Sequence, residues 1–305
     1  MSDHGHSHSH GQVTERTDSM RLSIALALIV AFMAVEIVVG IAVHSLALLS
    51  DAAHMLTDAA ALLVSLITIR LIARPAKGNL TFGFRRAEIL SAQANGYTLL
   101  FLAGLIVFEG IRRLISPPSP GGLAILIVAL IGIGVNLLAT WQLAKANRES
   151  MNIEGSFQHI VTDLLAFVLT AIAGVVILAT GFARADGIAS LVIAAIMLRA
   201  AYGLLRDSGR VLLEAAPAGM DVDAIGRSLA GHPRVTNVHD LHVWQIGSGF
   251  PALSAHVLVA PRDDCHGVRG ELEGLIRTEF GIEHTTLQVD HARESTLVTT
   301  VSTRP

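Results

Sequence analysis

The sequence predicts an all-α bundle of six transmembrane helices followed by a C-terminal domain of mixed α and β structure. Three observations support this fold class. Of the 305 residues, 52% are hydrophobic and only 15% are charged, whereas about 25% charged residues is usual for a soluble domain. Apolar stretches of about 20 residues, long enough to cross a bilayer as helices, recur through the first two thirds of the chain. After about residue 207 the composition becomes that of a soluble domain.

Turn signals separate the predicted membrane helices, whose ranges are 21–43, 46–72, 88–113, 121–144, 156–181 and 184–206. "RPAKGN" follows the second segment and "SPPSPGG" follows the third, and such proline- and glycine-rich stretches interrupt helices. Basic residues are concentrated in the second-to-third and fourth-to-fifth connections: Arg70, Arg74, Lys77, Arg85, Arg86, Lys145 and Arg148. Since cytoplasmic connections carry the excess of Lys and Arg, both termini are predicted to lie in the cytosol.

Residues 1–20 are polar and contain four histidines that alternate with small residues. Such a tract cannot build a packed core, so we expect a disordered cytosolic tail. Two interpretations of its histidines stay open, a loose metal-collecting segment and a solvated linker.

Residues 207–291 are expected to form a small cytosolic domain with the element order αββαβ, followed by a flexible tail over 292–305. The predicted helices cover 220–232 and 263–280, and the predicted strands cover 234–246, 250–260 and 284–291. "GSG" joins the first two strands, which predicts a tight hairpin turn.

Two membrane segments carry the same polar pattern. His54 and Asp58 are separated by four residues, and His159 and Asp163 repeat that spacing in the fifth segment. Residues at i and i+4 share one helix face, so the four side chains can close a tetrahedral shell of two nitrogens and two oxygens around Zn²⁺. The competing interpretation is polar contact between helices, for which Ser, Thr, Asn and Gln are more usual than Asp. Other polar residues of these segments are expected to line the bundle: Glu36, Gln93, Asn95, Glu109, Asn136, Gln142 and Asp186.

Histidines also gather in the C-terminal domain. His239 and His242 are three residues apart on a predicted strand, so regular alternation would place them on opposite faces of the sheet. His239 could meet His256 from the neighbouring strand, with Asp290 or His284 from the third, to form a second metal site. The alternative is that some of these histidines only serve the core or the surface, and for His232 and His266 this alternative is preferred.

Five blocks resemble the signature sequences of the cation diffusion facilitator family. They are "HSLALLSDAAHMLTD", "FGFRRAEIL", "SFQHIVTD", "VHDLHVWQI" and "HTTLQVD", and they occur in this order between about residues 20 and 291. The resemblance implies six transmembrane helices, a metallochaperone-like αββαβ cytosolic domain and a homodimer. It also implies export of Zn²⁺, or of Co²⁺, Cd²⁺ or Fe²⁺, in exchange for protons.

The resemblance also assigns roles by position. His54, Asp58, His159 and Asp163 match the family's transport site, and a histidine at the position of His54 goes with zinc rather than cadmium. By the same comparison His239, His256 and Asp290 match cytosolic ligands near the dimer interface, with Zn²⁺ as a regulatory ligand. Phe84 stands where some members carry a loop histidine, so no metal is expected in that loop, and Gln288 replaces another family histidine, which weakens a second cytosolic metal.

The predicted function is therefore secondary transport by alternating access in the cell inner membrane, with no enzymatic activity. A net charge of −3 gives no reason to expect nucleic acid as a partner. One rival is a membrane metal sensor without transport. The other is an intramembrane zinc hydrolase, but no HExxH occurs in the chain, and a catalytic zinc normally keeps an open coordination position.

Overall fold

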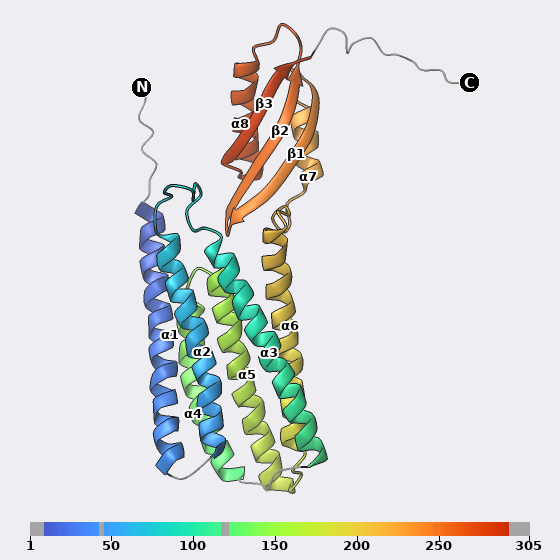
Figure 1. The fold of residues 1–305 in the computed structure, drawn as a ribbon. Coiled ribbons are helices and arrows are strands. Elements are labelled where there is room, and N and C mark those ends of the chain that lie inside the picture. The colour runs from blue at the N-terminus through green and yellow to red at the C-terminus, as the bar shows by residue number, and fades with distance from the viewer. Residues whose placement is uncertain (1–8, 43–45, 117–121, 293–305) are drawn as a thin grey trace, which may run out of the picture. The chain divides into compact units, whose positions relative to one another are not determined.

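The computed structural model describes residues 9–42, 46–116 and 122–292, and the chain divides into two compact units, Met1–Gly209 and Arg210–Pro305. Long helices make up the first unit (Figure 1): α1 (Ser9–Ala42), α2 (Leu46–Ile72), α3 (Ala87–Ile115), α4 (Gly122–Leu143), α5 (Met151–Thr180) and α6 (Ala185–Leu212). Five of these, all except α3, contain described stretches long and apolar enough to cross a membrane. The first unit is thus a helical transmembrane region.

Two helix starts differ from the sequence-based ranges. α1 begins at Ser9 and takes in residues 9–20 of the segment expected to be a disordered tail, while residues 1–8 lie outside the described part. α5 begins at Met151 rather than at residue 156, because Asn152 and Glu154 interrupt the apolar pattern in its first turn. The early start of α5 places His159 well inside the helix.

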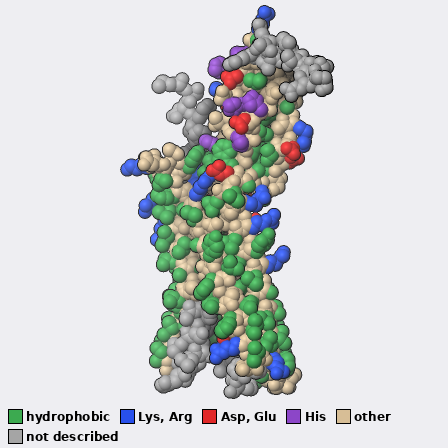
Figure 2. Space-filling model, turned by 45° about the vertical axis from the view of Figure 1, so that its right-hand side comes forward, with side chains coloured by type: hydrophobic (Ala, Val, Ile, Leu, Met, Phe, Trp, Pro, Cys, Tyr) green, Lys and Arg blue, Asp and Glu red, His purple; other side chains and the backbone are tan. Residues whose placement is uncertain are grey.

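The helical unit buries apolar side chains in two clusters. One cluster joins α1, α2, α4 and α5, with Leu22, Leu62, Leu143 and Ile160 at its centre. The other joins α3 and α6 through residues such as Leu99 and Met197. Large apolar side chains also cover the outside of the unit (Figure 2), among them Val38, Phe101, Phe108 and Tyr202. An apolar exterior of this extent would be unfavourable in water and suits a lipid environment.

The C-terminal unit is a small mixed sheet with two helices. Its elements are α7 (Val222–Ala230), β1 (Val235–Gly247), β2 (Phe250–Val259), α8 (Cys265–Phe280) and β3 (His284–His291). The strand order is β1-β2-β3, with β1 antiparallel and β3 parallel to β2. Helix side chains such as Leu229 and Leu272 pack on strand side chains such as Leu253 and Val257, and all four are fully buried. The observed element order is the predicted αββαβ.

Strand β1 is not regular. Its pairing with β2 shifts between His239 and His242, where Asp240 adopts a φ of 54°. The bulge lets Val238, Leu241 and Val243 all pack against the core. The predicted placement of His239 and His242 on opposite faces is therefore wrong, because it assumed uninterrupted alternation.

Helix α4 contains a matched pair of glycines that tests the packing of the bundle. A Cβ atom added at Gly132 would lie 2.5 Å from the ring of Phe167, whereas one added at Gly134 would have nothing within 4 Å. We expect Gly132→Ala to lower the melting temperature of the detergent-purified protein, since overpacking typically costs about 1–3 kcal/mol. Gly134→Ala should leave it unchanged or raise it, because Ala is favoured over Gly in helices by roughly 0.5–1 kcal/mol. Equal effects of the two substitutions would contradict the close packing of α4 on α5.

Candidate metal centre

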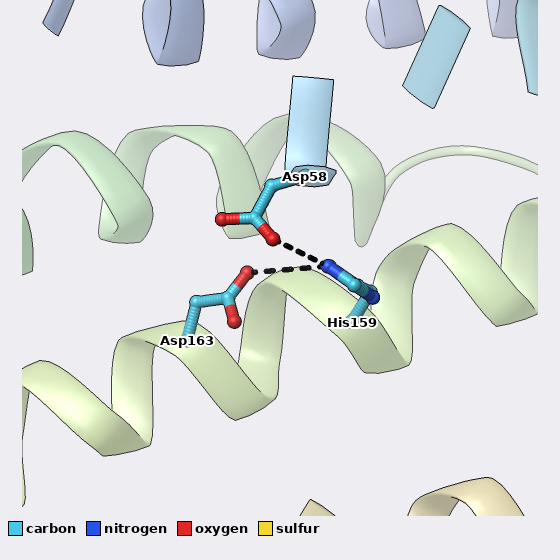
Figure 3. A group of neighbouring side chains, drawn as sticks. All are labelled: Asp58, His159 and Asp163. Carbon is cyan, nitrogen blue, oxygen red and sulfur yellow. Dashed lines mark hydrogen bonds and ion pairs between the residues drawn. The ribbon is translucent and has the colours of Figure 1, made fainter. Parts of the chain in front are cut away.

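Three side chains that could hold a metal ion meet between α2 and α5 (Figure 3): Asp58, His159 and Asp163. One possible ligand atom from each residue lies within 4.8 Å of the other two. His159 Nε2 is 2.7 Å from Asp58 Oδ1 and 4.0 Å from Asp163 Oδ2, so the imidazole nitrogen faces both carboxylates. In the part of the chain that the structure describes, no other group of three such residues is as close.

The helices explain why these side chains converge. His159 and Asp163 lie one turn apart on the same face of α5, and α2 packs against α5 and brings in Asp58. The exposed fraction is 8% for Asp58 and 2% for His159, so water does little to stabilise their charges. Buried carboxylates need a compensating cation or proton. Imidazole nitrogen and carboxylate oxygen are ligands that Zn²⁺ accepts in tetrahedral geometry.

The fourth predicted ligand is His54, whose side chain lies outside the described residues. The backbone of α2 is helical from Leu46 to Ile72, so residue 54 precedes Asp58 by one turn on the same helix face.

A buried polar network, which the sequence did not reveal, links α2, α3 and α5 one to two turns from the metal centre. Asn152 donates from Nδ2 to the Ser65 carbonyl oxygen at 3.0 Å, and its Oδ1 accepts from the Ser91 hydroxyl at 2.6 Å. The hydroxyls of Ser65 and Ser156 are 2.7 Å apart. Serines in apolar segments are common, so only the convergence of three helices shows that these residues act together. This polar network joins α2, which carries Asp58, to α5, which carries His159.

The histidines of the C-terminal unit are brought together only in part. The rings of His239 and His256 contact each other with centroids 5.3 Å apart. Asp240, displaced by the bulge, has Oδ1 2.9 Å from His242 Nε2 and Oδ2 3.9 Å from His256 Nε2. His239, Asp240 and His242 are exposed and His256 is half-buried. Figure 2 shows histidines gathered on the visible face of the C-terminal unit. The structure therefore adds Asp240 and His242 to the predicted pair of His239 and His256.

The third strand places its two candidate residues differently. The residue opposite His256 is Gln288, and Asp290 lies opposite Leu258, where it accepts a hydrogen bond from Gln288 at 2.8 Å. His284 lies opposite Ala252 and its ring contacts Phe250. Four residues of parallel strand span roughly 13 Å, so His284 is remote from His256 within the subunit.

Comparison with known proteins identifies the family. A family model described as the cation efflux transmembrane domain matches residues 22–213, and one described as the cation efflux protein cytoplasmic domain matches residues 217–292. This chain belongs to the cation efflux family. Members of the family are transporters, so this cation efflux protein is a transporter rather than an enzyme.

Named relatives match nearly the whole chain. A cadmium, cobalt and zinc/H⁺-K⁺ antiporter of Bacillus subtilis is 36% identical over 294 residues, which cover 94% of this chain and 92% of the relative. The zinc transporter ZitB of Escherichia coli K12 is 37% identical over 291 residues, with the same coverage. The metal cation efflux protein CzcD of Cupriavidus metallidurans is 37% identical over 292 residues, covering 94% and 90%.

The comparison with solved structures also gives a match for this cation efflux protein. It is the metal-bound C-terminal domain of the CzcD transporter, 29% identical, with a TM-score of 0.23. The match covers 23% of this chain and 99% of that structure.

The geometry of the metal centre makes a direct prediction about zinc affinity. Asp58→Asn removes a charged ligand oxygen, so we expect the dissociation constant for Zn²⁺ to rise at least about tenfold. Isothermal titration of the detergent-purified protein measures this change. Glu154→Gln is the matched control, because Glu154 lies on α5 and pairs with Arg148 outside the centre. Unchanged zinc affinity in Asp58→Asn would remove this residue from the site.

Proposed function

We propose that this protein exports Zn²⁺ from the cytosol in exchange for protons by alternating access. The observation that carries the proposal is the cluster of Asp58, His159 and Asp163 between two helices of the transmembrane region, with Asp58 and His159 buried and Asp163 half-buried. The names of the relatives agree with it, since they include a zinc transporter and a cadmium, cobalt and zinc/H⁺-K⁺ antiporter. No Walker A motif occurs in the sequence, which agrees with secondary transport rather than ATP-driven transport.

The exchange follows from the chemistry of the ligands. A metal ion binds neutral imidazole and ionised carboxylate, so zinc and protons compete for the same atoms. His54, Asp58, His159 and Asp163 form the transport site in this proposal. On the cytosolic side zinc displaces protons from these groups, and on the far side a higher proton concentration releases the metal. The proton gradient then drives export.

The choice of metal follows from the same donor set. Imidazole and carboxylate ligands suit Zn²⁺ and related borderline ions such as Co²⁺ and Cd²⁺, and Fe²⁺ is a further candidate. The histidine at position 54 favours zinc by analogy with the family. A sensor that binds zinc without moving it is the second candidate function, favoured by the histidine cluster of the C-terminal unit. The proposed hydrolase is excluded by membership of a transporter family.

We further propose that α3 is the sixth membrane-spanning helix and that the protein works as a homodimer. α3 contains 29 residues and packs against α2 and α5, as a spanning helix of the bundle would. Its charged residues, Glu88, Glu109, Arg112 and Arg113, lie towards its two ends. Its middle is therefore compatible with lipid.

The C-terminal unit is proposed to bind regulatory Zn²⁺ through His239 and His256, with Asp290 from the third strand and Asp240 and His242 from the bulge. His284 remains a candidate ligand only in the dimer, where it could form a separate metal site together with residues of a second subunit. Metal bound there would shift the transport equilibrium only if it bound one conformation more tightly than the other.

The transport proposal is tested by zinc uptake into proteoliposomes under an imposed pH gradient. Wild-type protein should show uptake that depends on the gradient, and Asp163→Ala should abolish it because a site carboxylate is lost. Glu154→Gln serves again as the control and should retain uptake. Flux that survives Asp163→Ala would move the site elsewhere, and zinc binding without any wild-type flux would favour the sensor.

The proposed orientation in the inner membrane, with both termini cytosolic, is tested by cysteine labelling. In a Cys265→Ser background, which removes the native cysteine, Lys77→Cys adds a thiol to the α2–α3 connection and Phe182→Cys adds one to the α5–α6 connection. We expect a membrane-impermeant maleimide to label Phe182→Cys in intact cells and Lys77→Cys only in inverted vesicles. The reverse pattern would place the termini outside.

A further inference from the structure

Three buried polar atoms on the packed helices α4 and α5 have no hydrogen-bond partner among the described residues: His159 Nδ1, Asn136 Oδ1 and Thr140 Oγ1. A buried polar atom without a partner typically costs about 1–3 kcal/mol. One such atom in a membrane bundle would need little explanation. Three in one region suggest that they meet a partner in a different state of the protein.

The amide of Asn136 has a defined orientation. Its Nδ2 donates to the Gly132 carbonyl oxygen at 3.1 Å, and an amide turned the other way would place two acceptors together. Oδ1 is therefore the amide atom that has no partner, and Asn136 is only 1% exposed. Thr140 follows one turn later, so both oxygens lie on the same side of α4.

The packing of α4 on α5 places these oxygens at the depth of the metal centre. The two helices are joined by residues 144–150 and pack against each other, so they run in opposite directions. Gly132 contacts Phe167. One turn from this contact towards the α4–α5 connection leads to Asn136 on α4 and Asp163 on α5, and the next turn leads to Thr140 and His159. This correspondence holds to within about one helical turn, roughly 5.4 Å.

The chemistry of the loaded site supplies the missing partner. In Figure 3 His159 Nε2 faces the two carboxylates, while the second ring nitrogen, Nδ1, points away from both. If a metal ion takes Nε2, the neutral imidazole carries its proton on Nδ1. A ligating histidine normally donates that N–H to an oxygen, which fixes the ring and strengthens the metal bond. Asn136 Oδ1 accepts only, and the Thr140 hydroxyl can also accept.

We propose that Asn136 and Thr140 are positioning residues for zinc: when the ion binds, their oxygens accept the Nδ1–H of His159, directly or through one water. The inference deepens the proposed function and rests on it. It assigns to α4, which carries none of the predicted ligands, a part in holding the metal.

The test compares zinc affinity with the stability of the metal-free protein. The double variant Asn136→Leu/Thr140→Val removes both acceptors, and we expect the dissociation constant for Zn²⁺ to rise by about 10- to 100-fold. Thr140→Ser keeps the hydroxyl and should bind like wild type. Thr98→Val is the matched control, since the Thr98 hydroxyl bonds to its own helix on α3. The melting temperature without metal should be unchanged or higher in the double variant, while the zinc-induced rise should shrink.

Two results would overturn the inference. One is wild-type zinc affinity in the double variant. The other is a fall in the melting temperature of the metal-free double variant that accounts for the weaker binding, which would make the role purely structural. Failure of the proposed function is separate, because it would show as absent zinc flux in wild-type proteoliposomes whatever the variants bind.

Discussion

The helical unit has to hold two carboxylates and an imidazole in a region where the surrounding side chains are apolar. Moving an isolated ionised carboxylate into such a medium is strongly unfavourable, and the group would otherwise bind a proton or be expelled. Here Asp58 has a hydrogen bond to His159, and Asp163 lies on the next turn of the same helix as the imidazole. The rest of the unit is consistent with this constraint: an apolar cluster packs around the helices of the site, and the polar network joins those helices.

The same constraint connects structure to transport. At the proposed site, two carboxylates and a histidine can be neutralised either by protons or by a divalent ion, so replacing one with the other would change the net charge only modestly. Tight binding alone would not move the ion. Transport requires that the helices around the site have two arrangements, and binding can favour one of them only through differential affinity.

Sequence patterns predicted the features that depend on local periodicity. The four-residue spacing of His159 and Asp163 indicated a common helix face because an α-helix repeats every 3.6 residues. The αββαβ order was likewise readable from alternation and turn residues. The face of the sheet on which each β1 side chain lies could not be predicted in this way, because the bulge at Asp240 depends on how β1 pairs with β2. The apolar pattern placed the start of α5 at residue 156, five residues after its first residue Met151, because Asn152 and Glu154 interrupt the apolar run. Asn152 and the serines around it join through tertiary contacts, which no local pattern encodes.

The polar network also affects how α2 and α5 can separate. Apolar surfaces that separate in a membrane protein must be covered again by lipid or another side chain, whereas hydroxyl and amide groups that part can each take up a water molecule. Water molecules can therefore replace these hydrogen bonds one at a time, both the Ser65–Ser156 contact and the bonds of Asn152. In the proposed transport cycle, separating α2 from α5 at this level would therefore exchange hydrogen bonds between side chains for hydrogen bonds to water rather than leave them unmade.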